Sequence, residues 1–247
     1  MNKFTVGIII FLLLGVGALA IFSPYIFNNN KVDYSSYDTA KIISGDENNG
    51  NIADHVRGKA DSSVVFLEYA DFQCSGCANM APKIDKIFEG YGDRVAFIYR
   101  NYPIDGHQNA RAAAAAVESA GLQGYYWQMS EQMFSTQADW FYTYDTEKRT
   151  NYYADLFTKV SEGKGDVEQF KKDLNSSSIQ KKIDFDKNLG KKRDSVDATP
   201  TIIINGEKVD FTNSNTDKKA EAIITEKLDE ALKNAGLETG SKAEDKK

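Results

Sequence analysis

The feature that most constrains the fold is a junction where a buried strand runs into a helix through two cysteines. Residues 64–69 form a short, largely apolar run typical of a buried central strand, and a helix is predicted from Cys74 to Tyr91. Unpaired backbone N–H groups and the positive end of the helix dipole stabilise a thiolate on Cys74. Cys77 follows one turn later on the same side, so the two sulfurs can close a small ring. The pattern predicts a redox-active dithiol.

The rest of the chain predicts one α/β domain interrupted by a helical insertion. Residues 95–99 form a second apolar strand, and the strand–helix–strand order implies a parallel pair with a right-handed crossover. Residues from 107 to about 195 are helical in character. A hairpin pattern over 201–211 and an amphipathic helix over 215–235 follow. The two halves of the sheet must therefore meet around the inserted helices.

The N-terminal residues predict a membrane segment. Residues 4–22 carry no charged side chain, and as a helix they would span about 28 Å, close to the roughly 30 Å hydrocarbon core of a bilayer. Lys3 precedes the run, so the positive-inside rule leaves the rest of the chain outside the cytoplasm. We expect residues 1–22 to be a signal anchor that makes this a single-pass cell-membrane protein. Cleavage of a signal peptide after Ala18-Leu19-Ala20 is the alternative.

On either interpretation the folded part is extracytoplasmic, where disulfides form and persist. The polar composition of residues 23–50 predicts a flexible linker. The folded domain is expected over 51–237, and the charged residues 238–247 are expected to be a disordered tail.

Composition excludes several kinds of function. The net charge of −6 argues against nucleic acid, because phosphate binding needs a basic surface. The chain has only two cysteines and two histidines, and His55 and His107 are not spaced as a pair of zinc ligands. We therefore expect neither a metal nor any other cofactor.

A second motif, Ala198-Thr199-Pro200-Thr201, directly precedes an isoleucine-rich strand. A cis bond before Pro200 would place the backbone of Thr199 where an extended peptide could pair with it. An ordinary trans proline at the start of a strand is the alternative.

Four stretches of this sequence together resemble one family. They are ADFQCSGC (70–77), YPIDGHQNA (102–110), AGLQGYYWQM (120–129) and TPTIIING (199–206). They resemble the DsbA-like thiol–disulfide oxidoreductases, especially their membrane-anchored bacterial branch. The resemblance covers about residues 52–235 and implies a thioredoxin fold with a helical insertion.

The resemblance also implies roles for individual residues. Cys74 would be the exposed nucleophile and Cys77 its buried partner, and Pro200 would be a cis-proline facing the disulfide. The backbone of Thr199 would bind substrate beside the dipeptide Ser75-Gly76.

Glu68 matches the buried acidic residue of the family, which would exchange protons with Cys77. An ordinary strand glutamate paired with a lysine is the alternative. Gly76 departs from the family, whose oxidases commonly carry His or Tyr in this position, and a glycine cannot stabilise the Cys74 thiolate. We therefore expect a less strongly oxidising disulfide than in the histidine-containing members.

The expected activity is that of a disulfide oxidase. The Cys74–Cys77 pair would introduce disulfides into reduced exported proteins. In this family an integral-membrane, quinone-linked thiol oxidase typically reoxidises the dithiol. An extracytoplasmic reductase or isomerase on the same fold is the first alternative. A binding or chaperone module with an incidental dithiol is the second.

Overall fold

The computed structural model describes residues 32–210 and 217–240. The predicted signal anchor, residues 1–22, lies outside these ranges. Within them, no helix is both long enough and apolar enough to cross a bilayer.

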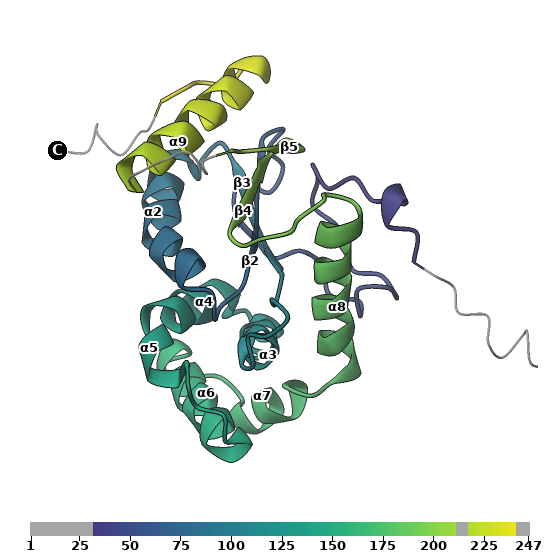
Figure 1. Ribbon diagram of the computed structural model, residues 1–247, viewed down its shortest axis with the longest axis vertical. Helices are drawn as coiled ribbons and strands as arrows, with labels where there is room; N and C mark the ends of the chain where they lie inside the picture. Colours follow the sequence, from purple (N-terminus) through teal and green to yellow (C-terminus); the bar gives the residue numbers. More distant parts are fainter. Residues whose placement is uncertain (1–31, 211–216, 241–247) are drawn as a thin grey trace, which may run out of the picture. The chain divides into compact units, whose positions relative to one another are not determined.

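A mixed sheet forms the centre of the described domain, with strand order β1-β3-β2-β4-β5 (Figure 1). The strands are β1 (Val56–Gly58), β2 (Val65–Ala70), β3 (Ala96–Asn101), β4 (Thr201–Ile204) and β5 (Glu207–Lys208). β2 and β3 are parallel, as predicted, and every residue of both is buried. Burial on both faces explains why both strands have largely apolar sequences. The predicted hairpin is the antiparallel pair β4–β5.

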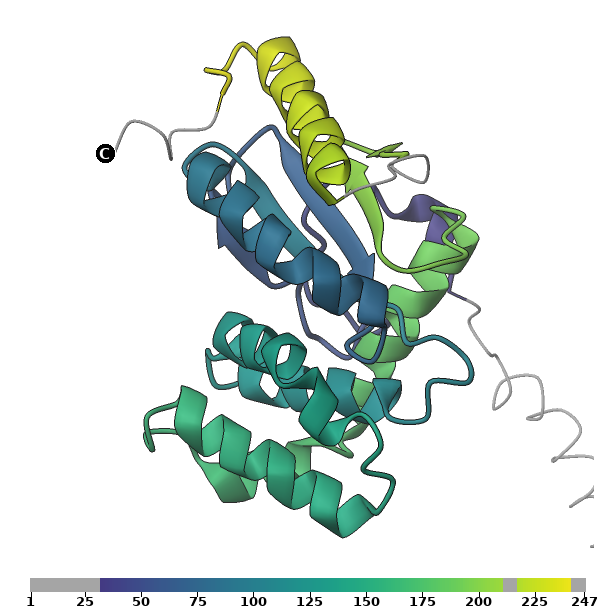
Figure 2. The same cartoon turned by 60° about the vertical axis from the view of Figure 1, so that its left-hand side comes forward.

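Helices cover both faces of this sheet. α2 (Ser75–Tyr91) and α9 (Asp217–Asn234) lie on one face and α8 (Ser177–Lys192) on the other (Figures 1 and 2). Alternate residues of a strand point to opposite faces, and Phe66 packs with α2 and α9. Glu68, two residues further along β2, therefore points to the face that α2 covers.

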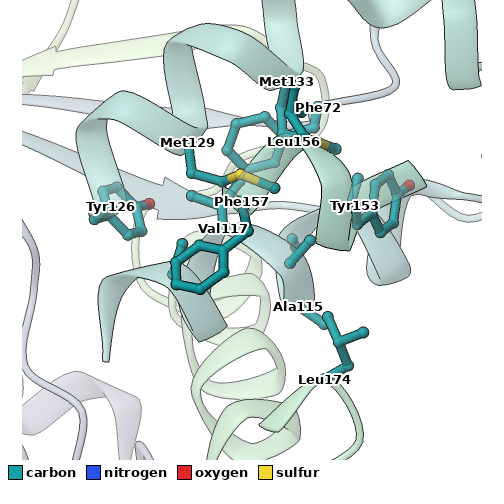
Figure 3. Packing of buried hydrophobic residues seen from close by; sticks show 14 of the residues in the cluster. Phe72, Ala115, Val117, Tyr126, Met129, Met133, Tyr153, Leu156, Phe157 and Leu174 are labelled. Atoms are coloured by element: carbon teal, nitrogen blue, oxygen red, sulfur yellow. The ribbon is translucent and has the colours of Figure 1, made fainter. Parts of the chain in front are cut away.

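The predicted helical insertion lies between β3 and β4. Its helices are α3 (Ala110–Gly121), α4 (Tyr126–Ser135), α5 (Gln137–Trp140), α6 (Thr146–Val160), α7 (Val167–Asp173) and α8. α8 begins as a separate helix because the Ser176 hydroxyl accepts a hydrogen bond from the N–H of Ile179 at 3.4 Å. Figure 3 shows Phe72, from the loop after β2, packed among side chains of the inserted helices, and Cys77 belongs to the same buried cluster. The core of the insertion is thus continuous with the dithiol loop.

The chain before β1 differs from the predicted flexible linker over residues 34–50. The Tyr37 ring packs edge-on against Phe185 of α8, with 4.8 Å between ring centroids. The Thr39 hydroxyl donates to Asp194 at 2.7 Å, and Asn49 is fully buried. Polar composition suggested a tether, but these polar side chains satisfy their hydrogen bonds within the fold.

The predicted tail also differs at its start. Arg94 donates from Nη1 to the carbonyl of Glu238 at 2.7 Å and from Nη2 to that of Gly240 at 2.8 Å. Residues 238–240 are therefore held against the domain. Residues 241–247 lie outside the described ranges.

A buried charge cluster joins the N-terminal segment, β3 and α8. Asp54 accepts hydrogen bonds from Arg100 Nη2 at 2.6 Å and from Lys182 Nζ at 3.1 Å, and all three side chains are buried. It also accepts the backbone N–H of Ile43 at 2.9 Å. Burial opposes the charged form of Asp54, but the two cations prevail and hold its pKa well below the usual range.

Replacing Asp54 with Asn should lower the free energy of unfolding by about 3–5 kcal/mol, because buried Arg100 loses its counter-charge and Lys182 keeps only Asp186. Denaturant melts at neutral pH measure this change. The matched control is Asp38→Asn, which breaks the exposed pair with Lys41 and should cost less than about 1 kcal/mol. Equal losses in the two variants would contradict a stabilising role for the cluster.

Candidate active site

The two cysteines lie where β2 passes into α2, as predicted. Cys74 is the N-cap residue of α2, with φ −75° and ψ 122°, and the helix begins at Ser75. Both thiols are free; Cys74 is half-buried and Cys77 is buried. The backbone N–H of Asp71 points at the Cys77 sulfur at 3.5 Å.

The two thiols have opposite electrostatic environments. The pKa of Cys74 falls from its ordinary value of 9.0 to about 5, mainly because the Cys77 thiol donates a hydrogen bond to its sulfur. Partial burial opposes this shift, while the backbone N–H groups of Cys77 and Gly76 add to it. Burial raises the pKa of Cys77 well above its ordinary value. Near neutral pH, Cys74 is therefore a thiolate and Cys77 a thiol.

The loop before β4 faces the same sulfur. The Thr199–Pro200 peptide bond is cis, as the resemblance implies, and the carbonyl oxygen of Thr199 lies 3.4 Å from Cys74 Sγ. Ser75 and Gly76 are exposed at the rim of the site. A Cβ atom on Gly76 would lie 3.5 Å from Cys74 Sγ and 3.4 Å from Pro200 Cδ. These residues converge on Cys74, although they come from two distant parts of the chain.

Glu68 lies beneath the dithiol, on the sheet face that α2 covers. Its neighbours across the sheet are Tyr99 and Ile202, and its Oε1 atom is buried without a hydrogen-bond partner among the described residues. Desolvation, reinforced by the charges of Asp85 and Cys74, raises its pKa to about 8. Among the residues that the structure describes, Glu68 forms no ion pair with a lysine. The alternative of a lysine partner is therefore not supported.

Sequence reasoning missed the polar residues that hold the loop before Cys74. The buried carboxylate of Asp71 accepts the N–H of Gln73 at 2.7 Å and that of Ile104 at 2.9 Å, and it lies 2.7 Å from Nδ1 of His107. Gln137 donates from Nε2 to the carbonyl of Cys74 at 3.2 Å. Ile104, His107 and Gln137 come from segments more than thirty residues away, so only the motif around His107 hinted at them.

The described residues offer no site for a metal. Nowhere in 32–210 or 217–240 do three or more His, Cys, Asp or Glu side chains gather as a set of ligands. The chemistry that this arrangement supports is thiol–disulfide exchange at Cys74.

A protein-family model described as Thioredoxin matches residues 50–226. The chain belongs to this thioredoxin family. BdbD from Bacillus subtilis, solved in its oxidised form, is 28% identical with a TM-score of 0.56, and the match covers 78% of this chain and 99% of BdbD. Alpha-DsbA1 from Wolbachia pipientis shares the fold, with a TM-score of 0.58 at 22% identity over 74% of this chain and 92% of that one.

Curated relatives match over a part of their length. The Na(+)/H(+) antiporter NhaA 1 of Mycolicibacterium gilvum is 31% identical over 158 residues, which are 63% of this chain and 24% of the antiporter. A second antiporter, from Mycolicibacterium vanbaalenii, is 32% identical over 156 residues. The chain spans about a quarter of the length of these relatives.

The family match and the arrangement of Cys74 and Cys77 indicate the same chemistry. The predicted resemblance to DsbA-like proteins is confirmed for the family and for the thioredoxin fold with its helical insertion. The chain has the thioredoxin fold, and the placement of Cys74 and Cys77 in it fits thiol–disulfide exchange.

Replacing Gly76 with His should lower the pKa of Cys74 further, because the imidazole would lie beside the sulfur and carries a positive charge when protonated. A shift of one pKa unit corresponds to about 1.4 kcal/mol in favour of the thiolate. It would make the dithiol roughly 30 mV more oxidising. Thiolate absorbance against pH and equilibration with glutathione measure the two quantities. Gly76→Gln is the control that adds bulk without charge, and an equal shift in both variants would rule out the charge effect.

Replacing Glu68 with Gln should change how stability depends on pH. A carboxyl whose pKa is raised to about 8 in the folded state stabilises the fold fully below its unfolded pKa of about 4.5. That contribution is lost as pH rises through 8. The wild-type protein should therefore lose stability relative to Glu68→Gln between pH 5 and about 9, as followed by urea melts. Parallel curves for the two proteins would mean that Glu68 is ionised in the folded state at neutral pH.

Proposed function

We propose that this protein is an extracytoplasmic disulfide oxidase that introduces disulfides into reduced exported proteins. The observation that carries the proposal is the pair of opposed thiol pKa values, with Cys74 lowered to about 5 and Cys77 raised. A thiolate of low pKa is a good leaving group, so the mixed disulfide with a substrate is released readily. Cys74 is also the more accessible of the two sulfurs.

The reaction begins with the disulfide between Cys74 and Cys77. A substrate thiolate attacks Cys74 Sγ and forms a mixed disulfide, while the electron pair of the broken S–S bond leaves with Cys77 Sγ. The Cys77 thiolate takes a proton from the neutral carboxyl of Glu68, which is close enough that its ionised form raises the pKa of Cys77.

A second substrate thiolate then attacks the substrate sulfur of the mixed disulfide. The substrate gains a disulfide, and Cys74 leaves as a thiolate that the Cys77 thiol and the start of α2 stabilise. The enzyme is left as the dithiol. During the attack, Thr199, Ser75 and Gly76 form the surface that the substrate backbone contacts, and Pro200 closes its other side.

The dithiol must lose two electrons before the next cycle. We propose that a membrane quinone-linked thiol oxidase accepts them, and that residues 1–22 anchor the chain in the cell membrane as a single pass with the catalytic domain outside. The charge-free run over 4–22 and the preceding Lys3 support this placement.

Thiol trapping in cells tests the direction of electron flow. For an oxidase, most of the protein should be recovered with Cys74 and Cys77 in the disulfide form. A Cys77→Ala variant should accumulate substrate adducts through Cys74, because Cys77 can no longer attack the mixed disulfide and release the substrate. Cys74→Ala is the matched control and should form few adducts, since Cys77 is buried. Recovery of the wild-type protein mainly as the dithiol would favour a reductase or isomerase instead.

A further inference from the structure

A cavity of about 300 Å³ opens in the helical insertion, on side chains that thiol–disulfide exchange does not use. Two arginines, Arg111 and Arg149, line it, and no aspartate or glutamate does. The whole chain carries a net charge of −6. The charged side chains that line the cavity are therefore positive, whereas the chain as a whole is negative.

Helix starts reinforce the positive charge. Lining residues lie at or near the beginnings of three helices: Gln108 before α3, Thr146 at the start of α6 and Asn175 before α8. The positive dipole end of a helix favours an anion, and among these three helices α3 has no side-chain cap, whereas Asp145 caps α6 and Ser176 caps α8.

The two arginines differ in their partners. Arg111 forms an ion pair with Asp184 and donates to Gln180 at 2.7 Å. Arg149 donates from Nη1 to the amide oxygen of Asn109 at 2.9 Å, and it makes no ion pair with a carboxylate in residues 32–210 or 217–240. A guanidinium has five N–H donors in a planar fork. Arg149 is therefore the cation of the cavity that retains donors for a ligand.

A buried hydroxyl on the cavity wall points to the same conclusion. Tyr153 is 1% exposed, and its hydroxyl has no hydrogen-bond partner within the described part of the chain. Figure 3 shows this hydroxyl directed away from the packed side chains of the cluster. Tyr153 and Arg149 line the same cavity; burial raises the pKa of Tyr153, and the charge of Arg149 acts against that rise. A buried donor without an acceptor is costly, and a ligand oxygen at this point would satisfy it.

We propose that this cavity binds a small organic carboxylate, with Arg149 pairing with the carboxylate and the Tyr153 hydroxyl donating a hydrogen bond to it. The rest of the wall includes apolar side chains, Ala112, Ala115 and Leu174. Such a wall suits the carbon skeleton of an organic acid, whereas all the oxygens of inorganic phosphate need polar partners. The carboxylate can belong to a free acid or to an acidic side chain of a polypeptide, and its chemistry is the same in both.

The cavity is linked through Asn109 to the residues that hold the loop before Cys74, but it is not part of the dithiol site. Asn109, which accepts from Arg149, also donates its backbone N–H to the Gln73 side chain at 2.7 Å, and Gln73 directly precedes Cys74. A substitution of Arg149 therefore removes its hydrogen bond to Asn109 as well as the proposed ligand-binding group.

Calorimetric titration at low ionic strength tests the proposal with three probes: glutarate, the capped peptide acetyl-Ala-Glu-Ala-amide, and inorganic phosphate. We expect glutarate or the peptide to bind saturably with a dissociation constant on the order of 1 mM or tighter. Binding by glutarate indicates a free acid, and binding by the peptide alone indicates a polypeptide side chain. Phosphate binding as tight as that of the carboxylates would overturn the proposal, as would the absence of saturable binding.

Variants of the full chain locate the binding. Arg149→Gln should weaken carboxylate binding at least about tenfold, because a charge-assisted pair is lost. Arg193→Gln, which removes an exposed arginine outside the cavity lining, should leave the affinity unchanged. Tyr153→Phe removes only the buried hydroxyl and should weaken binding severalfold while leaving the ligand-free protein as stable as before or more so. Unchanged affinity in both Arg149→Gln and Tyr153→Phe would contradict the proposed carboxylate site.

Discussion

Hydrogen bonds to the Cys74 sulfur at the start of α2 are the interaction on which the rest of the site depends. The Cys77 thiol and the backbone N–H groups of Gly76 and Cys77 all act on this one atom and lower its pKa to about 5. Cys74 remains half-exposed, so burial raises its pKa less than it would for a fully buried thiol. Cys77, three residues further on, is buried and stays protonated. A single helical turn thus separates a thiolate from a neutral thiol.

The two faces of the sheet show how neighbours decide the state of a buried carboxyl. Glu68 faces α2 beside Tyr99 and Ile202, where no cation of the described residues compensates its burial, and its pKa rises to about 8. Asp54, on the side of α8, meets Arg100 and Lys182 and is ionised. The first arrangement can store a proton near the dithiol, whereas the second holds distant parts of the chain together. Burial is the same in both, so the difference lies in the cations.

The helical insertion contributes to the site as well as covering it. Phe72 and Cys77 pack in the same buried cluster as the inserted helices. Gln137 binds the carbonyl of Cys74, and Asn109 binds the side chain of Gln73. The loop that carries Cys74 is therefore held by contacts from the insertion. Arg149, which lines the cavity, donates a hydrogen bond to the same Asn109.

The sequence alone determined the parts of this protein that depend on local order. The apolar runs of β2 and β3, the helix that begins after Cys74, the insertion and the β4–β5 hairpin could all be predicted, because their signals lie within a few consecutive residues. The tertiary structure decided what depends on partners far along the chain. It brought Thr199 and Pro200 to Cys74, buried Glu68 beside Tyr99 and Ile202, and packed residues 34–50 where a tether was expected. Side-chain charge states and polar contacts of this kind depend on which distant groups share a buried space. No local pattern carries that information, since only the folded chain brings those groups together.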